Sequence, residues 1–575
     1  MGQLDQLPAD IQKYILDSLP SVQHRISLAR TCKAWHRPAI TSAYHTVRFA
    51  CHDALYQSRA LAMLSPENAG LKQIRHLELV PAQAECEPGE ADPAITGALG
   101  LFSYLLPAHK LLSLSIDSCH VLDPEFVAVL HQRQRYLQSL RLDGCRTGTD
   151  NCLNENLLQE DSLIDVSHVS RLQIFVSNKW QADWFNIPEL PALTHLEVHV
   201  DAPSIFLVDG QDGDDPQRHL QLSQHIIGDL FGTEGGLHDQ LQSLSIRGLD
   251  LQEASTALTP ILRSPALTSL TLQGCRNITS LIQCWADDPL SLPRVTTLNI
   301  ANSSAEASYC LDLGTLNMLL MRLQGLTYLL LSVSDVPSSQ TTVRGLQAEA
   351  VTQHAETLRF AYLDVASQEP NFFLRGLQRC TKLRQLAIAN FGSALQPFPT
   401  SNSVPLEPVA MGMLTALKDL RTLYLLDDVA QPDPDGQFAN HATHLALRSK
   451  HLHDVSTYAF EGAPHLNVVG VGRRLRIHSQ MERDRQPHVR NQGPSAQQEV
   501  STPHRHQQNP PTNETQPPIY FIRAETKELG GRKTVAATEV TDLQRLQAVE
   551  PTSDILDIVA DSNRMLRSGK ALTPL

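Results

Sequence analysis

Apolar residues recur along most of this chain in the spacing L-x-x-L-x-L, in which Ile, Val or Ala replaces some of the leucines. The last two apolar positions of each segment are two residues apart, so both face the same side of a short strand. Thirteen such segments follow one another, and their intervals run from 24 residues (Val169 to Leu193) to 48 residues (Leu193 to Leu241). The segments open at Ile74, Leu111, Leu137, Val169, Leu193, Leu241, Leu267, Val295, Leu326, Leu358, Leu383, Leu420 and Leu466. The pattern predicts an array of short buried strands.

The residues between successive strands leave room for a helix that returns the chain to the start of the next strand. A single unit cannot bury its own apolar face, whereas stacked units share a continuous core. Helices are expected at Leu251–Thr259, where Pro260 would stop the helix, and at Leu374–Cys380; the stretch Leu313–Val333 is predicted as a helix followed by a strand. The fold class is therefore α/β, a leucine-rich-repeat solenoid with parallel strands on a concave face and helices outside. The weak segments at Leu358 and Leu466 leave the repeat count open by two or three.

The first 45 residues carry a different, helical pattern. Leu7, Ile11, Ile15 and Leu19 are four apart, which places them on one face of a helix. Pro20 disfavours helical geometry at the residue before it and ends this helix. A second periodic stretch runs from Ile26 to Trp35 and ends before Pro38, and a third short helix is expected around Ile40 and Tyr44. Three helices of this size bury a very small core, which gains stability against a partner or the array behind it.

These residues resemble the F-box family in order and spacing. The quoted segments are Leu7-Pro8-Ala9-Asp10-Ile11, Ile15-Leu16, Cys32-Lys33-Ala34-Trp35 and Tyr44. Asp10 stands where the family more often has Glu, and Thr31 stands where an aliphatic residue is usual. The resemblance implies binding to a Skp-type adaptor, which bridges to the cullin scaffold of a ubiquitin ligase. Its implied contact set is Leu7, Pro8, Ile11, Ile15, Leu16, Leu28, Cys32 and Trp35. The alternative is that these residues form only the core of a helical cap on the array.

The pattern divides the chain into an F-box-like module (1–48), a leucine-rich-repeat domain (49–472) and a mostly disordered tail (473–575). The stretch 480–518 is rich in Gln, Pro, His and Asn, a composition that disfavours a packed core. Within the tail, Ile519-Tyr520-Phe521-Ile522 has the composition of one added strand. Spaced aliphatic residues near 541–566 predict a short helix, which is a candidate partner-binding segment.

The residues between the leucines of each strand are expected to face the concave side. In the early units they are short, polar or charged, and they include Glu197 and Arg247. In the later units they become aromatic, and aromatic side chains are frequent energetic centres of protein interfaces. The hypothesis is that a target protein binds here, at Tyr328, Phe360, Tyr362 and Tyr424. The alternative is that these rings lie under loops between repeats or under a tail that covers the edge.

Charge and cysteine usage narrow the function classes. The net charge is −14, from 47 basic and 61 acidic residues, and such an acidic chain lacks the electrostatic footprint of a nucleic-acid-binding protein. No signal peptide and no membrane span are expected. Ten cysteines without a C-x-x-C pair indicate reduced thiols and a location in the cytoplasm, the nucleus or both. Cys119, Cys145 and Cys275 are expected to have a structural role where strands turn.

Motifs for catalysis are missing: the sequence has no G-x-S-x-G, no phosphate-binding glycine loop and no H-E-x-x-H. No cofactor and no metal are expected, and an enzyme is disfavoured because an open array face seldom encloses a pocket. The leading hypothesis is a substrate-recognition adaptor of a Skp–cullin–F-box ubiquitin ligase, with an unknown target protein. The alternative is a leucine-rich-repeat interaction scaffold unconnected with ubiquitin. A weaker third hypothesis is a hydrolase-like activity hidden in the array.

Overall fold

The structure is a computed structural model of the chain. It describes residues 7–19, 22–50, 56–68, 70–80, 98, 100–102, 104–116, 132–142, 170–176, 192–200, 216–231, 240–287, 294–302, 309–333, 345–365, 370–389, 407–426, 452–454, 456–457, 459–472, 519–527, 533–540, 543–551 and 553. The chain divides into two compact units, Met1–Arg294 and Val295–Leu575, hereafter the first and second units.

The first unit begins with three helices, α1 (Ala9–Ser18), α2 (Val22–Ala29) and α3 (Lys33–His45). The expectation that a helix ends before Pro38 is wrong, because α3 continues through this proline. Pro38 cannot donate a hydrogen bond to the carbonyl four residues earlier, which costs about 3 kcal/mol in a helix interior. Burial of Trp35, Ala39 and Ala43 on the same helix offsets that cost.

The strands of the first unit are all parallel and lie side by side in chain order. They are β1 (Thr46–Ala50), β2 (His76–Val80), β3 (Ser113–Ile116), β4 (Ser139–Leu142), β5 (Arg171–Val176), β6 (His195–Val200), β7 (Ser243–Arg247) and β8 (Ser269–Gln273). Sequence analysis missed β1, which follows α3 directly and carries only Val47 and Phe49 of the apolar pattern.

Short helices connect these strands: α4 (Tyr56–Met63), the 3-10 turn η2 (Leu71–Gln73), α8 (Pro216–Phe231), α9 (Ser255–Arg263) and α10 (Ile278–Asp287). The expectation that Pro260 stops a helix is wrong, because α9 contains it. As in α3, buried neighbours hold the helix together: Ile261 and Leu262 pack into the core directly after the proline.

In the second unit, six parallel strands in chain order are followed by two antiparallel ones. They are β9 (Thr297–Asn302), β10 (Tyr328–Val333), β11 (Phe360–Asp364), β12 (Gln385–Ala389), β13 (Thr422–Leu426), β14 (Val468–Gly472), β15 (Ile519–Lys527) and β16 (Lys533–Val540). The helices are α11 (Leu313–Arg322), α12 (Ala348–Thr352), α13 (Pro370–Leu377), α15 (Glu407–Ala416) and α18 (Leu543–Val549).

The predicted α/β array of parallel strands is confirmed. Each of the strands β2 to β14 begins two residues after one of the thirteen predicted openers, from Ile74 and His76 to Leu466 and Val468. The weak segments at Leu358 and Leu466 are true repeats, because β11 and β14 continue the same register. Two-residue alternation sets this register, since a slip of one residue would move every leucine to the opposite face.

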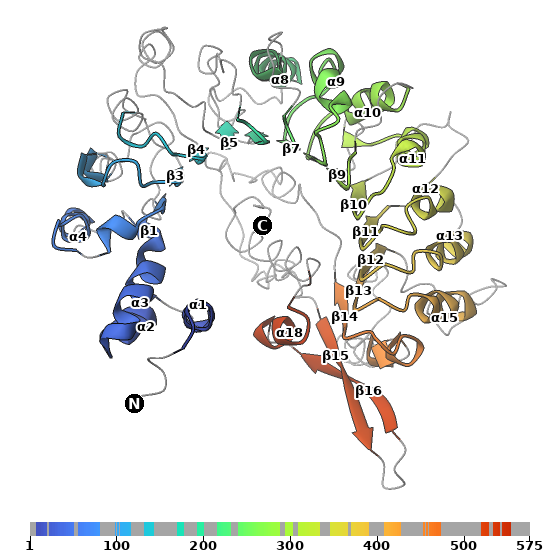
Figure 1. Cartoon of the computed structure of the whole chain (residues 1–575). Helices are drawn as coiled ribbons and strands as arrows, with labels where there is room; N and C mark the ends of the chain where they lie inside the picture. Colours follow the sequence, from blue (N-terminus) through green and yellow to red (C-terminus); the bar gives the residue numbers. More distant parts are fainter. Residues whose placement is uncertain are drawn as a thin grey trace, which may run out of the picture. The chain divides into compact units, whose positions relative to one another are not determined.

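In the second unit, α11, α12, α13 and α15 lie on one side of the strands and α18 lies on the other (Figure 1). We call the side opposite to the connecting helices the inner face of each unit. The strand predicted at Ile519-Tyr520-Phe521-Ile522 is present as the start of β15, and β15 and β16 form an antiparallel hairpin on the edge of β14. The helix expected near 541–566 is observed as α18, while residues 473–518 and 554–575 lie outside the described part of the chain.

Candidate functional site

The three front helices have an apolar cluster of their own. Its buried centre is Leu16, Ala29, Trp35 and Ala39, and six partly buried side chains surround it: Leu7, Ile15, Leu19, Leu28, Cys32 and Ile40. Two members of the predicted adaptor-binding set, Leu16 and Trp35, therefore lie in the core of this small module. Such residues hold the helices together, and they reach a partner only if the module opens.

One side of α1 remains open to solvent. Ile11 is 46% exposed and Tyr14 is 75% exposed, and Pro8 precedes them at the start of the helix. Residues three and four apart on a helix are neighbours, so Ile11, Tyr14 and the half-buried Ile15 share one side. We call Pro8, Ile11 and Tyr14 the α1 patch. Sequence analysis missed Tyr14, although its spacing of three residues from Ile11 was a usable signal.

The predicted adaptor-binding residues thus divide into three groups by burial. Pro8 and Ile11 are exposed, and Leu16 and Trp35 are buried. The half-buried members are Leu7, Ile15, Leu28 and Cys32. All eight lie in one helical module, and their contact with an adaptor stays a prediction.

The module is also joined to the array. Helix α3 runs directly into β1, and the half-buried Tyr44 packs against the apolar cluster under β1 and β2. A methyl group added at Gly70 would lie 2.3 Å from the Tyr44 ring, so the glycine leaves the space that this ring fills. The aromatic residue that closes the F-box-like pattern therefore has a structural contact with the repeats.

The aromatic residues predicted to bind a target are not an open surface. Tyr328 is half-buried and stacks on Phe360, with ring centroids 3.9 Å apart and an interplanar angle of 1°. Phe360 is buried, and Tyr362 and Tyr424 are 0% exposed. The expectation that these four rings are exposed is wrong for this structure, whereas their binding to a target stays a prediction.

Strand register explains how two of these rings fit together. Tyr362, Ala387, Tyr424, Gly470 and Tyr520 occupy successive strands at one level of the inner face. Large and small residues alternate along this row, so each ring lies over a neighbour that leaves room for it. At Gly470 the fit is close, because an added Cβ would lie 2.3 Å from Cδ2 of Tyr424.

The C-terminal elements complete the cover over these rings. Tyr520, Ile522 and Val540 of the hairpin and Leu546 of α18 belong to the same buried cluster as Tyr362 and Tyr424. Two polar contacts join the segment after α18 to the strands. Thr422 Oγ1 donates to Ser553 Oγ (3.3 Å), and Asn467 Nδ2 donates to Glu550 Oε2 (2.8 Å). Of the alternatives that sequence analysis left open, a tail over the rings is the arrangement observed.

The hydroxyl of Tyr424 is the polar atom least satisfied by this cover. It is buried, and no described residue forms a hydrogen bond with it. Burial raises its pKa well above 10, with smaller contributions from Tyr520 and Tyr362. The group therefore stays protonated, and its O–H is a donor without an acceptor.

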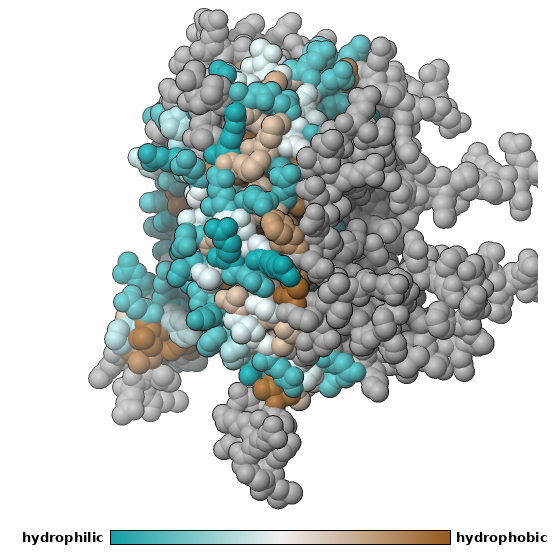
Figure 2. All heavy atoms as spheres, turned by 90° about the vertical axis from the view of Figure 1, so that its right-hand side faces the viewer, coloured by the Kyte–Doolittle hydropathy of each residue, from teal (hydrophilic) through white to brown (hydrophobic). Residues whose placement is uncertain are grey.

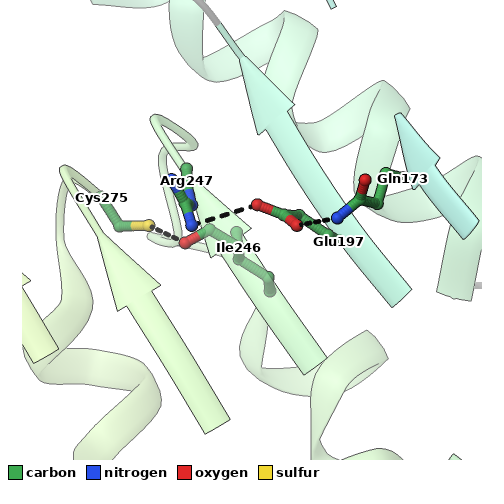
Figure 3. A network of polar contacts seen from close by, with 5 residues as sticks. All are labelled: Gln173, Glu197, Ile246, Arg247 and Cys275. Atoms are coloured by element: carbon green, nitrogen blue, oxygen red, sulfur yellow. Dashed lines mark hydrogen bonds and ion pairs between the residues drawn. The ribbon is translucent and has the colours of Figure 1, made fainter. Parts of the chain in front are cut away.

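On the inner face of the first unit, charged and polar side chains of three adjacent strands contact one another. Gln173 Nε2 donates to Glu197 Oε2 (2.7 Å), and Arg247 pairs with Glu197 Oε1 (3.1 Å), as Figure 3 shows. The three side chains come from adjacent strands β5, β6 and β7. Sequence analysis placed Glu197 and Arg247 on an open polar surface, but both are buried. The ion pair therefore ties neighbouring strands together in a site of low solvent access.

Of the three cysteines expected to have a structural role, Cys275 lies among the described residues. Cys275, also drawn in Figure 3, is buried and its thiol donates to the carbonyl of Ile246 (3.5 Å). Burial raises the pKa of this thiol to about 12, so it is not a nucleophile at neutral pH. Cys119 and Cys145 lie outside the described residues. Within those residues no group of three or more His, Cys, Asp or Glu has a metal-binding arrangement.

His354 is a buried titratable group in the second unit. Its Nε2–H donates to the carbonyl of Leu320 (3.0 Å), and its Nδ1 has no hydrogen-bond partner among the described residues. Burial lowers its pKa below 6.5, although the bond to Leu320 opposes this shift. The charged form would bury a second N–H without an acceptor, so the fold favours the neutral ring.

This shift predicts that acid destabilises the second unit. Above pH 6.5 the ring is neutral in both folded and unfolded chains, so no penalty arises. Below pH 6.5 the unfolded chain binds the proton first, and the free energy of unfolding falls by up to about 1.4 kcal/mol per pH unit until the folded pKa is reached. Urea unfolding between about pH 7.5 and pH 5 measures this slope. His354→Gln keeps a donor for Leu320 without titrating, and we expect a shallower slope; an unchanged slope would contradict the assignment.

The helix-covered side of the second unit has a mixed surface. Figure 2 views the molecule from the right-hand side of Figure 1, where α11 to α15 lie. Hydrophilic and intermediate residues cover most of the coloured area, and hydrophobic residues form small separate groups. Met318, Met321 and Phe372 are exposed apolar residues on these helices. Scattered apolar residues are normal on protein surfaces and define no site by themselves. Among the helices in the described ranges, none has the length and hydropathy needed to cross a bilayer.

No protein-family model matches the chain, and no curated protein sequence matches it. Among solved structures, it is similar to a chain in the crystal structure of the Rad7 and Elc1 complex in yeast. The TM-score is 0.33 and the sequence identity is 14%, and the match covers 74% of this chain and 91% of that chain. A TM-score this low supports no conclusion about fold or function, so the proposals below depend on residues of this chain alone.

Proposed function

We propose that the protein is the substrate receptor of a Skp–cullin–F-box type ubiquitin ligase, acting in the cytoplasm or nucleus. In this proposal the front helices bind a Skp-type adaptor and the repeat array binds the target protein. The observation that carries the proposal is the α1 patch. A small helical module with its own core leaves Ile11 and Tyr14 exposed on one side of its first helix, and exposed aromatic and aliphatic side chains are favoured interface anchors.

The protein itself would catalyse no reaction. Its role would be to hold the lysines of a target near a ubiquitin-charged enzyme, which raises their effective concentration without any new chemistry. This role needs a rigid link between the two binding surfaces. Within the first unit, the continuous passage from α3 into β1, with Tyr44 packed on the repeats, joins the front helices to the first strands of the array.

The test is capture of a purified Skp-type adaptor by the full chain. The variant Ile11→Asp/Tyr14→Asp places two charges on the α1 patch and leaves the buried residues Leu16 and Trp35 in place. We expect its dissociation constant to rise about 30-fold or more, since two interface anchors are lost. Leu61→Asp is the matched control, because Leu61 is 51% exposed on α4 in the same unit; it should bind as the wild type does. Equal binding by both variants would disprove the docking role of the α1 patch.

A second candidate is an interaction scaffold in which the front helices only cap the array. The contact between Tyr44 and the cluster under β1 and β2 favours this alternative, because a cap must pack on the repeats it covers. It predicts that the wild-type chain captures no Skp-type adaptor. It also predicts that Tyr44→Ala destabilises β1 and β2, measured by faster amide hydrogen exchange in those strands. The adaptor capture experiment therefore separates the two candidates.

A further inference from the structure

The inner face of the second unit is covered by two C-terminal pieces that differ in how they are held. The hairpin is part of the sheet: the first four residues of β15, Ile519 to Ile522, pair with β14, and Phe521 is buried. The guanidinium of Arg523 also donates to the carbonyls of Phe460 and Ala463 (3.0 and 3.3 Å). Removing the hairpin would therefore leave the edge of β14 unpaired.

Helix α18 and the turn after it are held differently. This segment follows β16 and adds no strand to the sheet. Its contacts with the inner face include the fully buried Leu546, the bond from Asn467 to Glu550 and the bond from Thr422 to Ser553. The helix has seven residues, which is too short to be stable alone in water. Its order therefore depends on the face it covers, as the order of a bound peptide does.

The two main contacts have a defined spacing. Leu546 lies in α18 and Glu550 directly follows its last residue, with the Glu550 N–H donating to the carbonyl of Leu546 (2.9 Å). The two residues are therefore one helical turn apart, Leu546 buried among the aromatic rings and Glu550 bonded to Asn467. This is the helix-in-groove mode of recognition, in which an apolar residue anchors the helix and a polar residue fixes its register. The inner face thus selects a helix with a leucine followed four residues later by a carboxylate.

The cover is an imperfect fit in one respect. The buried hydroxyl of Tyr424, in the same cluster as Leu546, has no hydrogen-bond partner among the described residues. A buried donor without an acceptor is costly. A ligand that supplies an acceptor at this point would bind this face more tightly than α18 does.

We propose that α18 with the described residues after it, 543–551 and Ser553, is a displaceable internal ligand of this face, and that the target segment it excludes is an amphipathic helix with the same leucine and carboxylate spacing. The connection to the proposed function is that this target would be the protein delivered to the ligase. In the resting chain the tethered segment occupies the face at a high effective concentration. Target binding then requires release of α18, so the segment acts as a gate on recognition.

The experiment measures binding of a fluorescent peptide spanning residues 541–555 to the full-length chain by anisotropy. The wild-type chain should bind it weakly, because its own segment competes. Leu546→Asp in the chain should release α18 and increase peptide affinity about 100-fold, since a charge in the apolar site is strongly disfavoured. Glu550→Ala in the chain removes the bond to Asn467 and leaves Leu546 in place, and an increase of about ten-fold is expected.

Two controls make the result specific. Val549→Asp changes an exposed position of the same helix and should leave peptide affinity at the wild-type level. A peptide carrying Leu546→Asp should bind none of the chains. Amide hydrogen exchange in β10 to β14 establishes whether each chain is folded. If Leu546→Asp unfolds the chain, the comparison of peptide affinity between Glu550→Ala and wild type tests the proposal.

The proposal would be overturned if all chains bound the peptide with equal affinity, or if no chain bound it. It would also be overturned if the Leu546→Asp peptide bound as tightly as the wild-type peptide. The adaptor takes no part in this experiment. Its outcome is therefore separate from adaptor capture: loss of adaptor binding would remove the ligase role and leave the internal ligand in place.

Discussion

Replacing Arg247 with methionine is expected to lower the free energy of unfolding by about 3–5 kcal/mol. The guanidinium of Arg247 pairs with the buried carboxylate of Glu197 at 3.1 Å, and their side chains are 5% and 8% exposed. Methionine has a similar length and stays apolar, so the loss comes mainly from the carboxylate left behind. Gln173 alone would then bond a buried negative charge.

A double variant separates charge from packing. Arg247→Met with Glu197→Gln removes the unpaired charge and keeps a polar group for Gln173. We expect this double variant to be more stable than Arg247→Met alone by at least about 1 kcal/mol, and the double-mutant cycle gives the coupling energy. Urea unfolding followed by circular dichroism measures both, and hydrogen exchange in β5 to β7 locates the change. A double variant that is no more stable than the single one would mean that Arg247 contributes through packing.

Gly470→Val is expected to cost about 3 kcal/mol or more in the free energy of unfolding. Strand propensity predicts the opposite sign, because valine favours strands and glycine does not. In the structure a larger side chain at Gly470 is destabilising, because even a Cβ there would lie 2.3 Å from Cδ2 of Tyr424 and 3.2 Å from Cδ1 of Tyr520. The Tyr424 ring is fully buried and lies between its neighbours at Ala387 and Gly470 in the register row.

Gly412→Ala is the matched control for this prediction. Gly412 lies in α15 of the same unit, and the nearest group to an added Cβ is the flexible amide of Gln378 at 3.0 Å. Alanine is favoured over glycine in a helix interior by about 1 kcal/mol, so this variant should be as stable as wild type or more so. A smaller side chain at the facing position should relieve the clash in Gly470→Val, so we expect Tyr424→Leu to be less destabilising in that background than in wild type. A fully additive pair would contradict the proposed contact.

The three front helices show which features can be predicted from the local sequence pattern alone. The four-residue spacing of Leu7, Ile11 and Ile15 predicted α1, and the helix is present. The same local rules placed a break at Pro38, where α3 in fact continues. Local preferences sum only over neighbours in sequence, whereas Trp35 and Ala39 gain their burial from α1 and α2 across the module. Exposure on α1 was likewise decided by the tertiary structure, because Ile11 within the apolar stripe is open to solvent whereas Leu16 beside it is buried.

By itself, the sequence determined the strands of the array. Leucines two residues apart tolerate only one register when one side of the strand is buried, so the thirteen strands from β2 to β14 begin at constant offsets from the predicted openers. Only the tertiary structure decided what covers the opposite side. The contacts that close the inner face join residues far apart in the chain, such as Thr422 with Ser553 and Asn467 with Glu550, which are 131 and 83 positions apart. A repeat pattern describes each strand and its neighbours, and it carries no information about a distant segment that returns to pack on them.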